Sequence, residues 1–182
     1  SGFGAEAIAT QRVGGQSEAV SWNTADGVGA ALNAFIGQNY GAGKMDRVKK
    51  GYRASLITVG VWGLFITFLF VCFPEQISGV FFHEPTAIAT AVGYMISIGY
   101  SEAFMSVELM TVGALSGLGK THLCSVISIT LTSARIPLAI LLSGTALGLL
   151  GIWWALTATS VVKGIVFVMA FYWITAKMRN SK

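Results

Sequence analysis

Long stretches without charge are the feature that most constrains the fold of this chain. Residues from Ala54 to Phe73 include no acid or base other than the thiol of Cys72. About 20 apolar residues in a helix are enough to cross the hydrocarbon layer of a membrane. A second stretch, from Ile136 to Val162, is longer and contains the turn-like sequence Gly144–Gly151. These stretches indicate a membrane protein rather than a soluble domain.

The composition supports the same conclusion. Hydrophobic residues make up 54% of the 182 residues and charged residues only 11%, whereas soluble domains have about 25% charged residues. The mean hydropathy is +0.68. We therefore expect an all-α, polytopic membrane helical bundle with about five transmembrane helices. Cys72 and Cys124 both lie in apolar runs, so we expect no disulfide between them.

Turn residues divide the chain into five expected helices. The sequence Gly41-Ala42-Gly43 ends the first helix, because glycine readily adopts the left-handed cap, and Pro74 ends the second. The link at residues 74–85 contains an apolar stretch that suits the membrane interface. The chain begins with Ser1 and no signal peptide precedes the first apolar run, which indicates a piece of a larger protein. The expected helices are Ala5–Asn39, Ala54–Phe73, Thr86–Ser116, His122–Leu142 and Ile152–Ala176.

Lysine and arginine are distributed unevenly among the links. The links after the second and fourth helices contain neither residue. The links after the first and third helices and the end of the chain contain Lys44, Arg47, Lys49, Lys50, Arg53, Lys120, Lys177, Arg179 and Lys182. The positive-inside rule places these segments in the cytoplasm, with the N-terminus outside and the C-terminus inside. Anionic lipid explains the net charge of +4, so we expect no nucleic acid partner.

The first helix carries a polar stripe. At about 100° per residue, its polar positions fall within an arc of roughly 80°. Such a stripe in an apolar span must face protein or a water-filled cavity, because a carboxylate at the bilayer centre costs about 2.5–3.5 kcal/mol. The alternative for Asp26 is a solvated cap of a local break at Gly27. The stripe consists of Gln11, Glu18, Trp22, Asp26, Gly29 and Asn33.

The third expected helix contains two further acids. On a continuous helix, Ser97, Ser101 and Glu108 lie within about 40° of one another, and Glu102 points some 120° away from Glu108. The two acids are therefore not expected to act as a pair, and we favour Glu108 as the deeper one. The alternative for Glu108 is a structural ion pair with Arg135 or Lys163.

Arg135 and Lys163 are predicted to be structural charges. Each either pairs with an acid inside the bundle or extends toward a membrane interface. No spacing of histidine, cysteine and acidic residues resembles a metal site, and no serine–histidine–acid arrangement is supported. We therefore expect neither a metal nor an enzyme.

The sequence ALSGLGKT, residues 114–121, approaches a phosphate-binding loop. That pattern indicates nucleotide binding only between a strand and a soluble helix. Expected membrane spans flank it here, so we favour a tight cytoplasmic turn over a nucleotide site.

Several fragments together resemble the C-terminal half of the multidrug and toxic compound extrusion (MATE) transporters. They cover most of the chain and occur in the family's order. The fragments are GAEAIATQRV (4–13), GVGAALNAFIGQNYGAGKMDRVKKGYRAS (27–55), FPEQI (73–77), VGALSGLGKT (112–121), ARIPLAILL (134–142) and GLLGIWWAL (148–156).

The resemblance implies a twelve-helix fold with two six-helix lobes around a central cavity. It implies that residues 1–182 are part of the C-terminal lobe, from the eighth helix to the twelfth, without the first lobe and the seventh helix. It also implies secondary active efflux across the cell membrane, in which organic, often cationic, compounds leave in exchange for H⁺ or Na⁺. No other cofactor is implied. The implied partners are drug-like small molecules, membrane lipid and the missing lobe.

The resemblance further implies that acids buried in the lobe bind the coupling cation. The candidates here are Glu18, Glu108, Asp26 and Glu102. The candidates for the substrate cavity are Gln11, Trp22, Asn33, Ser101 and Tyr100, and the aromatic faces of Trp22, Tyr100 and Phe104 suit an organic cation.

Two alternatives remain at this point. One is a flippase for lipid-linked precursors from the same superfamily, which a cationic cavity containing Arg135 and Lys163 would favour. The other is a membrane-anchored nucleotide-binding protein built on residues 114–121.

Overall fold

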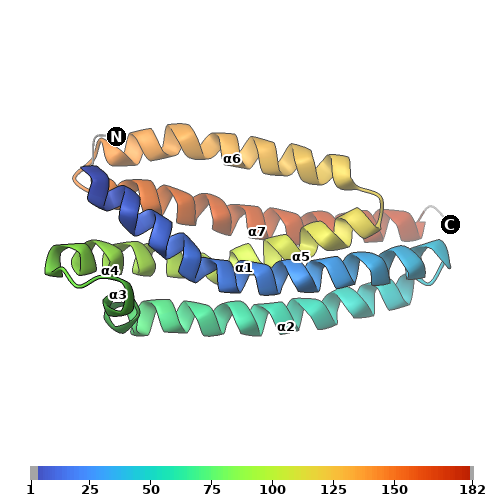
Figure 1. The fold of residues 1–182 in the computed structure, drawn as a ribbon. Helices are drawn as coiled ribbons and strands as arrows, with labels where there is room; N and C mark the ends of the chain where they lie inside the picture. Colours follow the sequence, from blue (N-terminus) through green and yellow to red (C-terminus); the bar gives the residue numbers. More distant parts are fainter. Residues whose placement is uncertain (1–3, 181–182) are drawn as a thin grey trace.

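The chain folds into a bundle of long helices. The computed structural model describes residues 4–180, and within them every regular element is a helix. The long helices run side by side along one axis (Figure 1), as expected for an all-α membrane bundle. The helices are α1 (Gly4–Gly41), α2 (Met45–Cys72), α3 (Pro74–Phe81), α4 (Pro85–Gly99), α5 (Glu102–Gly117), α6 (Thr121–Ser143) and α7 (Leu149–Asn180).

The described residues form seven helices, where the sequence predicted five spans. One additional helix is α3, which lies in the link expected at residues 74–85. Pro74 is at the start of α3, where its missing N–H leaves no hydrogen bond unmade. The other arises because the third expected span is broken into α4 and α5.

The remaining expected helices have nearly the bounds that the sequence predicted. The exception is α2, which begins at Met45 rather than Ala54, so Lys49 and Arg53 lie on a helix and not in a link. The reason is that the preceding turn is very short: Gly43, with φ of +73°, completes it. Pro137 lies inside α6 without ending that helix.

The break between α4 and α5 is held together by side chains. A broken helix inside a membrane needs new partners for its free backbone groups. Ser101 donates from Oγ to the carbonyl of Ile98 at 2.8 Å. Thr67 of α2 donates to the carbonyl of Gly99 at 2.9 Å, and Thr157 of α7 donates to that of Ser97 at 2.5 Å. Three carbonyl groups at the break therefore accept hydrogen bonds from side-chain hydroxyl groups.

Glycines allow α1 and α5 to pack backbone against backbone. A Cβ atom added at Gly113 of α5 would overlap the main chain of Gly29 of α1, and one at Gly117 would overlap that of Asn33. Small residues at such contacts are typical of membrane helices. Gly29, a member of the predicted stripe, thus faces protein. α5 becomes the central helix, in contact with α1, α2 and α7.

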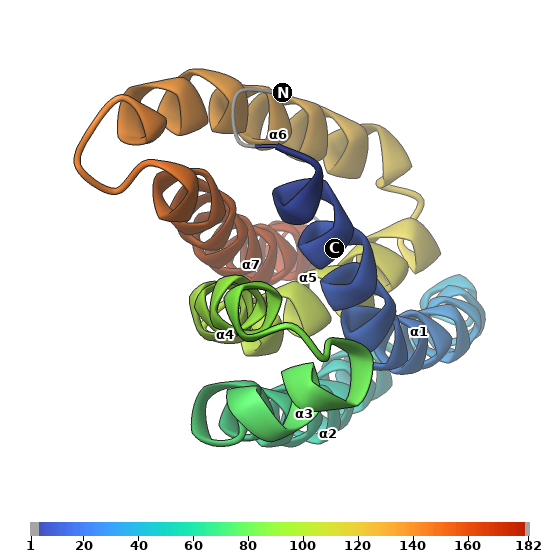
Figure 2. The same ribbon diagram turned by 60° about the vertical axis from the view of Figure 1, so that its left-hand side comes forward.

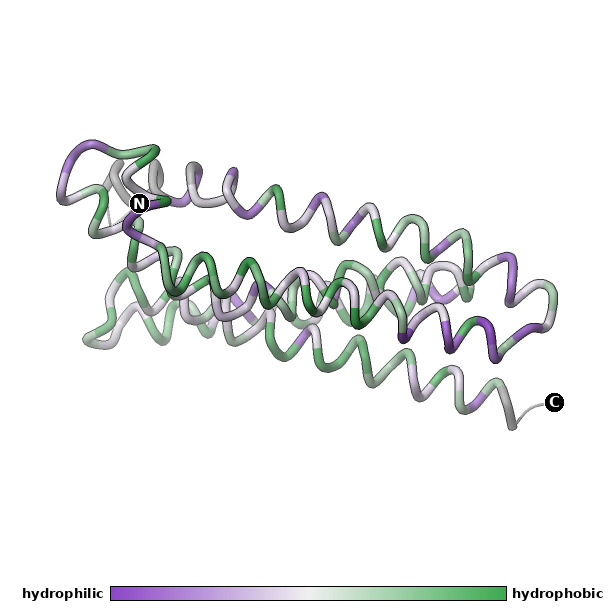
Figure 3. Tube along the Cα trace, turned by 90° about the horizontal axis from the view of Figure 1, so that it is seen from below, coloured by the Kyte–Doolittle hydropathy of each residue, from purple (hydrophilic) through white to green (hydrophobic). Residues whose placement is uncertain are grey.

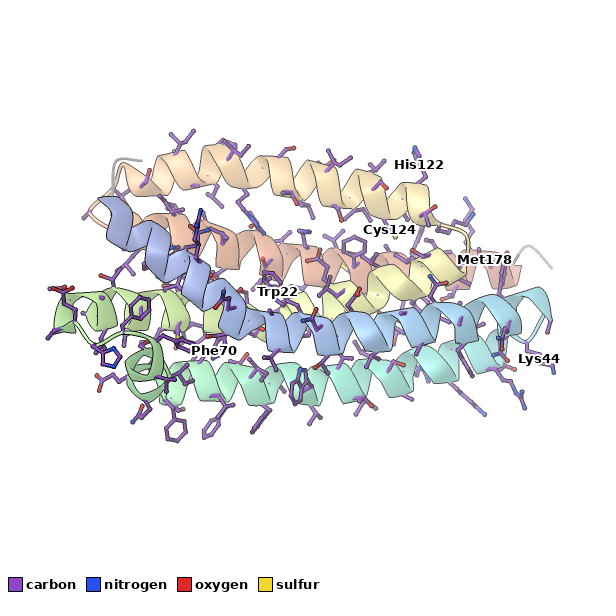
Figure 4. The ribbon with its side chains drawn as sticks, viewed as in Figure 1. Trp22, Lys44, Phe70, His122, Cys124 and Met178 are labelled. Atoms are coloured by element: carbon purple, nitrogen blue, oxygen red, sulfur yellow. The ribbon has the colours of Figure 1, made fainter. Side chains whose placement is uncertain are left out.

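The two ends of the bundle differ in charge. The α1–α2 turn, the α5–α6 turn and the end of α7 lie at one end, whereas α3 and the α6–α7 loop lie at the other (Figure 1). Lys44 and Met178 mark the first end and Phe70 lies toward the second (Figure 4). Lys182 and the side chain of Arg179 lie outside the described residues. The other basic residues that were predicted to share one side of the membrane lie in segments at the end marked by Lys44 and Met178, or in helices that lead to that end.

Among the described residues, three helices, α2, α6 and α7, are long and apolar enough to cross a membrane. Hydrophobic segments run through the middle of the bundle, and hydrophilic segments occur toward its ends (Figure 3). α6 packs along α7 and has few contacts with α5. In the oblique view, α6 runs across the top of the bundle, with α7 and the start of α1 both below it (Figure 2).

Candidate functional site

Two adjoining hollows lie between α1, α5, α6 and α7. One, of about 230 Å³, reaches α4 and is here named the glutamate hollow. The other, of about 320 Å³, is named the ion-pair hollow. The glutamate hollow is lined by Gln11, Gly15, Glu18, Trp22, Tyr94, Ile98, Met105, Arg135, Leu156 and Ser160. The ion-pair hollow is lined by Trp22, Asn23, Asp26, Met105, Glu108, Leu109, Arg135, Ser160 and Lys163.

The two hollows share one wall. Residues common to both linings are Trp22, Met105, Arg135 and Ser160. These side chains come from four different helices, and Trp22 lies midway along the bundle on α1 (Figure 4). The arrangement therefore places the acids of both hollows around a common central group.

Glu18 is buried on α1, with 3% of its surface exposed. Its Oε1 accepts a hydrogen bond from the hydroxyl of Tyr94 on α4. Tyr94 in turn packs edge-on against Trp153 of α7, with ring centroids 5.2 Å apart. Glu18 is thus held in place by a residue from a different helix, which the sequence did not indicate.

Glu102 is fully buried at the start of α5, and neither of its carboxylate oxygens has a hydrogen-bond partner among the described residues. Polar groups of α1 lie near it: the Ser21 hydroxyl is close to Glu102, and Glu18 is near enough to interact with it electrostatically. Ser21 itself is bonded to Ser106 of α5 at 3.3 Å. Two acids therefore lie near one another in the core, and neither forms an ion pair within the described residues.

Glu108 is part of an ion pair. Its Oε1 lies 2.6 Å from Nζ of Lys163, and each side chain is 12% exposed. This pair is the structural alternative that the sequence left open for Glu108. Lys163 also donates to the hydroxyl of Thr132 on α6 at 3.5 Å, so it links three helices.

Arg135 is held by neutral groups. Its Nε donates to Thr159 Oγ1 at 2.9 Å, and its Nη2 donates to Ser160 Oγ at 3.1 Å. Glu108 interacts with it electrostatically, but within the described part of the chain no carboxylate lies within ion-pair distance of Arg135. The expected acidic partner is replaced by two hydroxyl groups of α7.

A model of the MatE protein family matches residues 1–141, which is most of the chain. The chain belongs to the MatE family. A probable multidrug resistance protein, NorM of Thermotoga maritima, is 30% identical to this chain. The match covers 92% of this chain and 37% of that protein. A NorM protein of Pseudomonas aeruginosa with the same description is 26% identical over 97% of this chain and 38% of that protein.

The fold of this MatE chain also matches a crystal structure of MATE in the bent conformation. The TM-score is 0.90 and the identity 16%, over 98% of this chain and 40% of that one. At this identity the likeness shows the fold alone. The chain spans well under half the length of the relatives that it matches. Family and fold together identify it as a multi-pass membrane protein.

The stripe predicted on α1 of the MatE chain faces the hollows over part of its length. Gln11, Glu18, Trp22 and Asp26 line one or both hollows. Asn33, which was expected to line the cavity, lines neither hollow and is exposed. α1 passes without a break through Gly27, so Asp26 is not the cap of a local break; its side chain is exposed at the ion-pair hollow.

Three residues of the third expected span that were predicted to contact the substrate, Ser101, Tyr100 and Phe104, line neither hollow. Ser101 is buried and bonded within the α4–α5 break. Tyr100 is exposed and stacks on Trp154, with ring centroids 5.8 Å apart. These predictions assumed one continuous helix, and the break rotates the residues on its two sides out of the assumed register.

The two acids on this segment differ in burial. Glu102 is 0% exposed, whereas the Glu108 side chain is 12% exposed. Glu102, not Glu108, is the more buried acid. Which of the candidate acids binds a coupling ion is taken up below as a proposal.

Sequence reasoning did not find Tyr94, Ser21 or the hydroxyl groups of Thr159 and Ser160. Each contacts a predicted residue from a different helix, and the sequence around each of them contains no motif that indicates this contact. Only the pairing of helices in space brings them to the site.

The segment 114–121 contains the α5–α6 turn, as predicted: residues 114–117 end α5 and residues 118–120 form the turn. Leu118 follows α5, Gly119 has φ of +72°, and α6 begins at Thr121. A phosphate-binding loop requires a preceding strand, and helices lie on both sides of this turn. The structural context for nucleotide binding is therefore absent from this segment.

Proposed function

We propose that this chain is part of a secondary active transporter that exports organic, often cationic, compounds in exchange for H⁺ or Na⁺. The observation that carries the proposal is a pair of buried acids: Glu18 lines the glutamate hollow, and Glu102, which lines neither hollow, lies close enough to interact with Glu18. A buried carboxylate without a partner costs several kcal/mol as an ion. A proton or a sodium ion that binds there would offset this cost.

The mechanism would be competition between the coupling cation and the exported compound. A cationic compound in the glutamate hollow interacts favourably with ionised acids and loses that interaction when an inorganic cation occupies them. A ligand shifts a conformational equilibrium only by its difference in affinity between the two states. The two kinds of cation would therefore favour different states of the transporter.

Glu18 and Glu102 are the preferred coupling residues in this proposal. Glu108 already has Lys163 as a counter-ion at 2.6 Å, so an added cation would have to displace an ammonium group. Asp26 is exposed and needs no cation to offset burial. Both remain candidates of lower rank.

The names of the relatives support this function. Both are described as multidrug resistance proteins, and neither description is that of an enzyme. Because this chain spans 37–38% of their length, we propose that the first lobe and the seventh helix complete the transporter around residues 1–182. We expect no nucleic acid partner and no resident cofactor.

The test is export of ethidium by the full-length gene product in cells, with pH and sodium concentration varied. Glu18→Gln and Glu102→Gln are each expected to lower export at least tenfold, because each removes a site for the coupling ion. Glu75→Gln is the matched control, since Glu75 is exposed on α3 and its loss should leave export unchanged. Full export by both core variants under every ion condition would disprove the coupling role.

A flippase for lipid-linked precursors is the second candidate. The observation that favours it is the presence of both Arg135 and Lys163 in the ion-pair hollow, since cations suit a diphosphate headgroup. Ethidium export that depends on the ion gradient, without translocation of a labelled lipid-linked precursor in vesicles, would decide for efflux.

A further inference from the structure

A groove lies between the start of α6 and the end of α7, at the end of the bundle marked by Lys44 and Met178 (Figure 4). It holds about 400 Å³ and shares no lining residue with the glutamate hollow or the ion-pair hollow. We name it the lysine groove. Its lining consists of Lys120, Leu123, Trp173, Ile174, Lys177 and Met178.

The lysine groove combines apolar side chains with two ammonium groups. Ile174 is buried, Leu123 and Met178 are partly buried, and the two lysines are exposed. The described side chains that line the groove include no acid, and neither lysine forms an ion pair with a described residue. The groove therefore presents positive charge without a counter-ion beside an apolar surface.

Trp173 orients one of the two ammonium groups. Nζ of Lys177 lies 5.3 Å from the centroid of the Trp173 ring, which is within the range of a cation–π interaction. The ring itself is exposed. Exposed tryptophan is typical of the interface between membrane and water, where its ring lies at the level of the headgroups.

The position of the groove along the helices corresponds to the surface of a membrane. The apolar span of α6 begins at Thr121, and that of α7 ends at Met178. All the lining residues lie within about two helical turns of these two points. Lipid headgroups lie at the ends of such spans and acyl chains lie along them. The groove is therefore placed where a phospholipid changes from polar to apolar.

Lys120 also belongs to residues 114–121, the segment that approaches a phosphate-binding loop in sequence. Helices flank this segment, so it lacks the context of a nucleotide site. A lysine nevertheless binds a phosphate oxygen as a point charge without such a loop. A lipid phosphate at the membrane surface is a partner that suits both its charge and its position.

From these observations we infer that the lysine groove binds an anionic phospholipid. The phosphate would lie near Lys120 and Lys177, and part of an acyl chain would lie along Leu123, Ile174 and Met178. Basic pockets between membrane helices on the cytoplasmic side suit anionic headgroups. The inference goes beyond the export function, because it concerns a lipid ligand at a site outside both hollows.

The test uses the purified full-length gene product in micelles of a nonionic detergent. Dioleoyl phosphatidylglycerol, which is anionic, or dioleoyl phosphatidylcholine, which is zwitterionic, is added. Bound lipid is measured by native mass spectrometry, and the melting temperature is measured in parallel. We expect phosphatidylglycerol to bind more tightly and to raise the melting temperature more, because a ligand of the folded state stabilises that state.

The double variant Lys120→Gln and Lys177→Gln tests the site itself. We expect it to bind phosphatidylglycerol about thirtyfold more weakly, because each lysine near an anionic lipid contributes about a factor of five. Binding of phosphatidylcholine should not change. Replacing both lysines by arginine should retain most of the affinity. The matched control is Lys44→Gln with Lys50→Gln, since both are exposed near the same end and neither lines the groove.

A soluble anion tests whether the acyl chain contributes. Glycerol phosphate contains the phosphate of the lipid without its acyl chains, so at the same concentration we expect it to leave the melting temperature unchanged. Equal stabilisation by glycerol phosphate and by phosphatidylglycerol would assign the groove to free anions and overturn the lipid assignment.

Three other results would also disprove the inference. One is equal binding of the two lipids by the unmodified protein, and another is equal loss of phosphatidylglycerol in the groove variant and in the control. The third is no bound phosphatidylglycerol in the full-length protein, which would mean that another segment covers the groove. None of these results affects the proposed function, which is tested separately by export of ethidium.

Discussion

The hydrogen bond from Tyr94 to Glu18 joins α4 to α1 beside the glutamate hollow. The tyrosine hydroxyl donates to one of the two carboxylate oxygens that a coupling cation would bind. A hydrogen bond to a charged group contributes about 1.5–3 kcal/mol. Its removal therefore gives a specific expectation for ion binding.

We expect Tyr94→Phe to lower the half-saturating concentration of the coupling ion about tenfold, because the cation no longer competes with the hydroxyl group. The measurement is ethidium export as a function of pH and of sodium concentration. Tyr40→Phe is the control, since Tyr40 is exposed near the end of α1. Unchanged ion dependence in Tyr94→Phe would mean that Glu18 does not bind the ion.

At this scale, the sequence predicted the acids and the central aromatic residue but not their partners. Helical periodicity placed Glu18, Trp22 and Asp26 on one face of α1, and all three line a hollow. Periodicity could not show that Tyr94 bonds to Glu18 or that Glu102 has no partner. Both facts depend on which helices are neighbours, and a single helical pattern does not contain that information.

At the scale of elements, the contact between α1 and α5 gives the clearest prediction. Alanine stabilises a helix interior relative to glycine by about 1 kcal/mol. At Gly113 the added methyl group would overlap the main chain of Gly29, and overpacking costs about 1–3 kcal/mol. At Gly60 of α2 no atom lies within 4 Å of the added carbon.

We therefore expect Gly113→Ala to lower the melting temperature of the purified full-length protein and Gly60→Ala to leave it unchanged or raise it. Equal effects at both positions would contradict the backbone contact. The pair is matched because both substitutions add one methyl group in the interior of a helix.

The elements were largely predictable from apolar length and turn residues. The expected helices at residues 5–39 and 122–142 agree closely with α1 and α6. The break at Tyr100–Ser101 was not predicted, because a single glycine, Gly99, does not by itself end a membrane helix. The break depends on hydroxyl groups of Thr67 and Thr157, which belong to other helices.

At the scale of the whole molecule, the basic segments lie together at one end of the bundle (Figure 1). We expect this end to face the cytoplasm, because positively charged links remain on that side of the membrane. The opposite end, which contains α3 and the α6–α7 loop, should then face outward.

Cysteine labelling tests this orientation in a background without Cys72 and Cys124. We expect a membrane-impermeant maleimide to label His83→Cys in intact cells, and Lys44→Cys only after permeabilisation. Both residues are exposed, and they lie in the α3–α4 link and the α1–α2 turn. The reverse labelling pattern would invert the proposed topology.

The glycine contact between α1 and α5 also limits how the molecule can move. Two helices whose main chains touch cannot approach further, and separating them would leave an unfilled space between them. We therefore expect α1 and α5 to travel as one rigid body. The freedom to widen or narrow the space around Arg135 would then belong to α6, whose packing is almost entirely against α7.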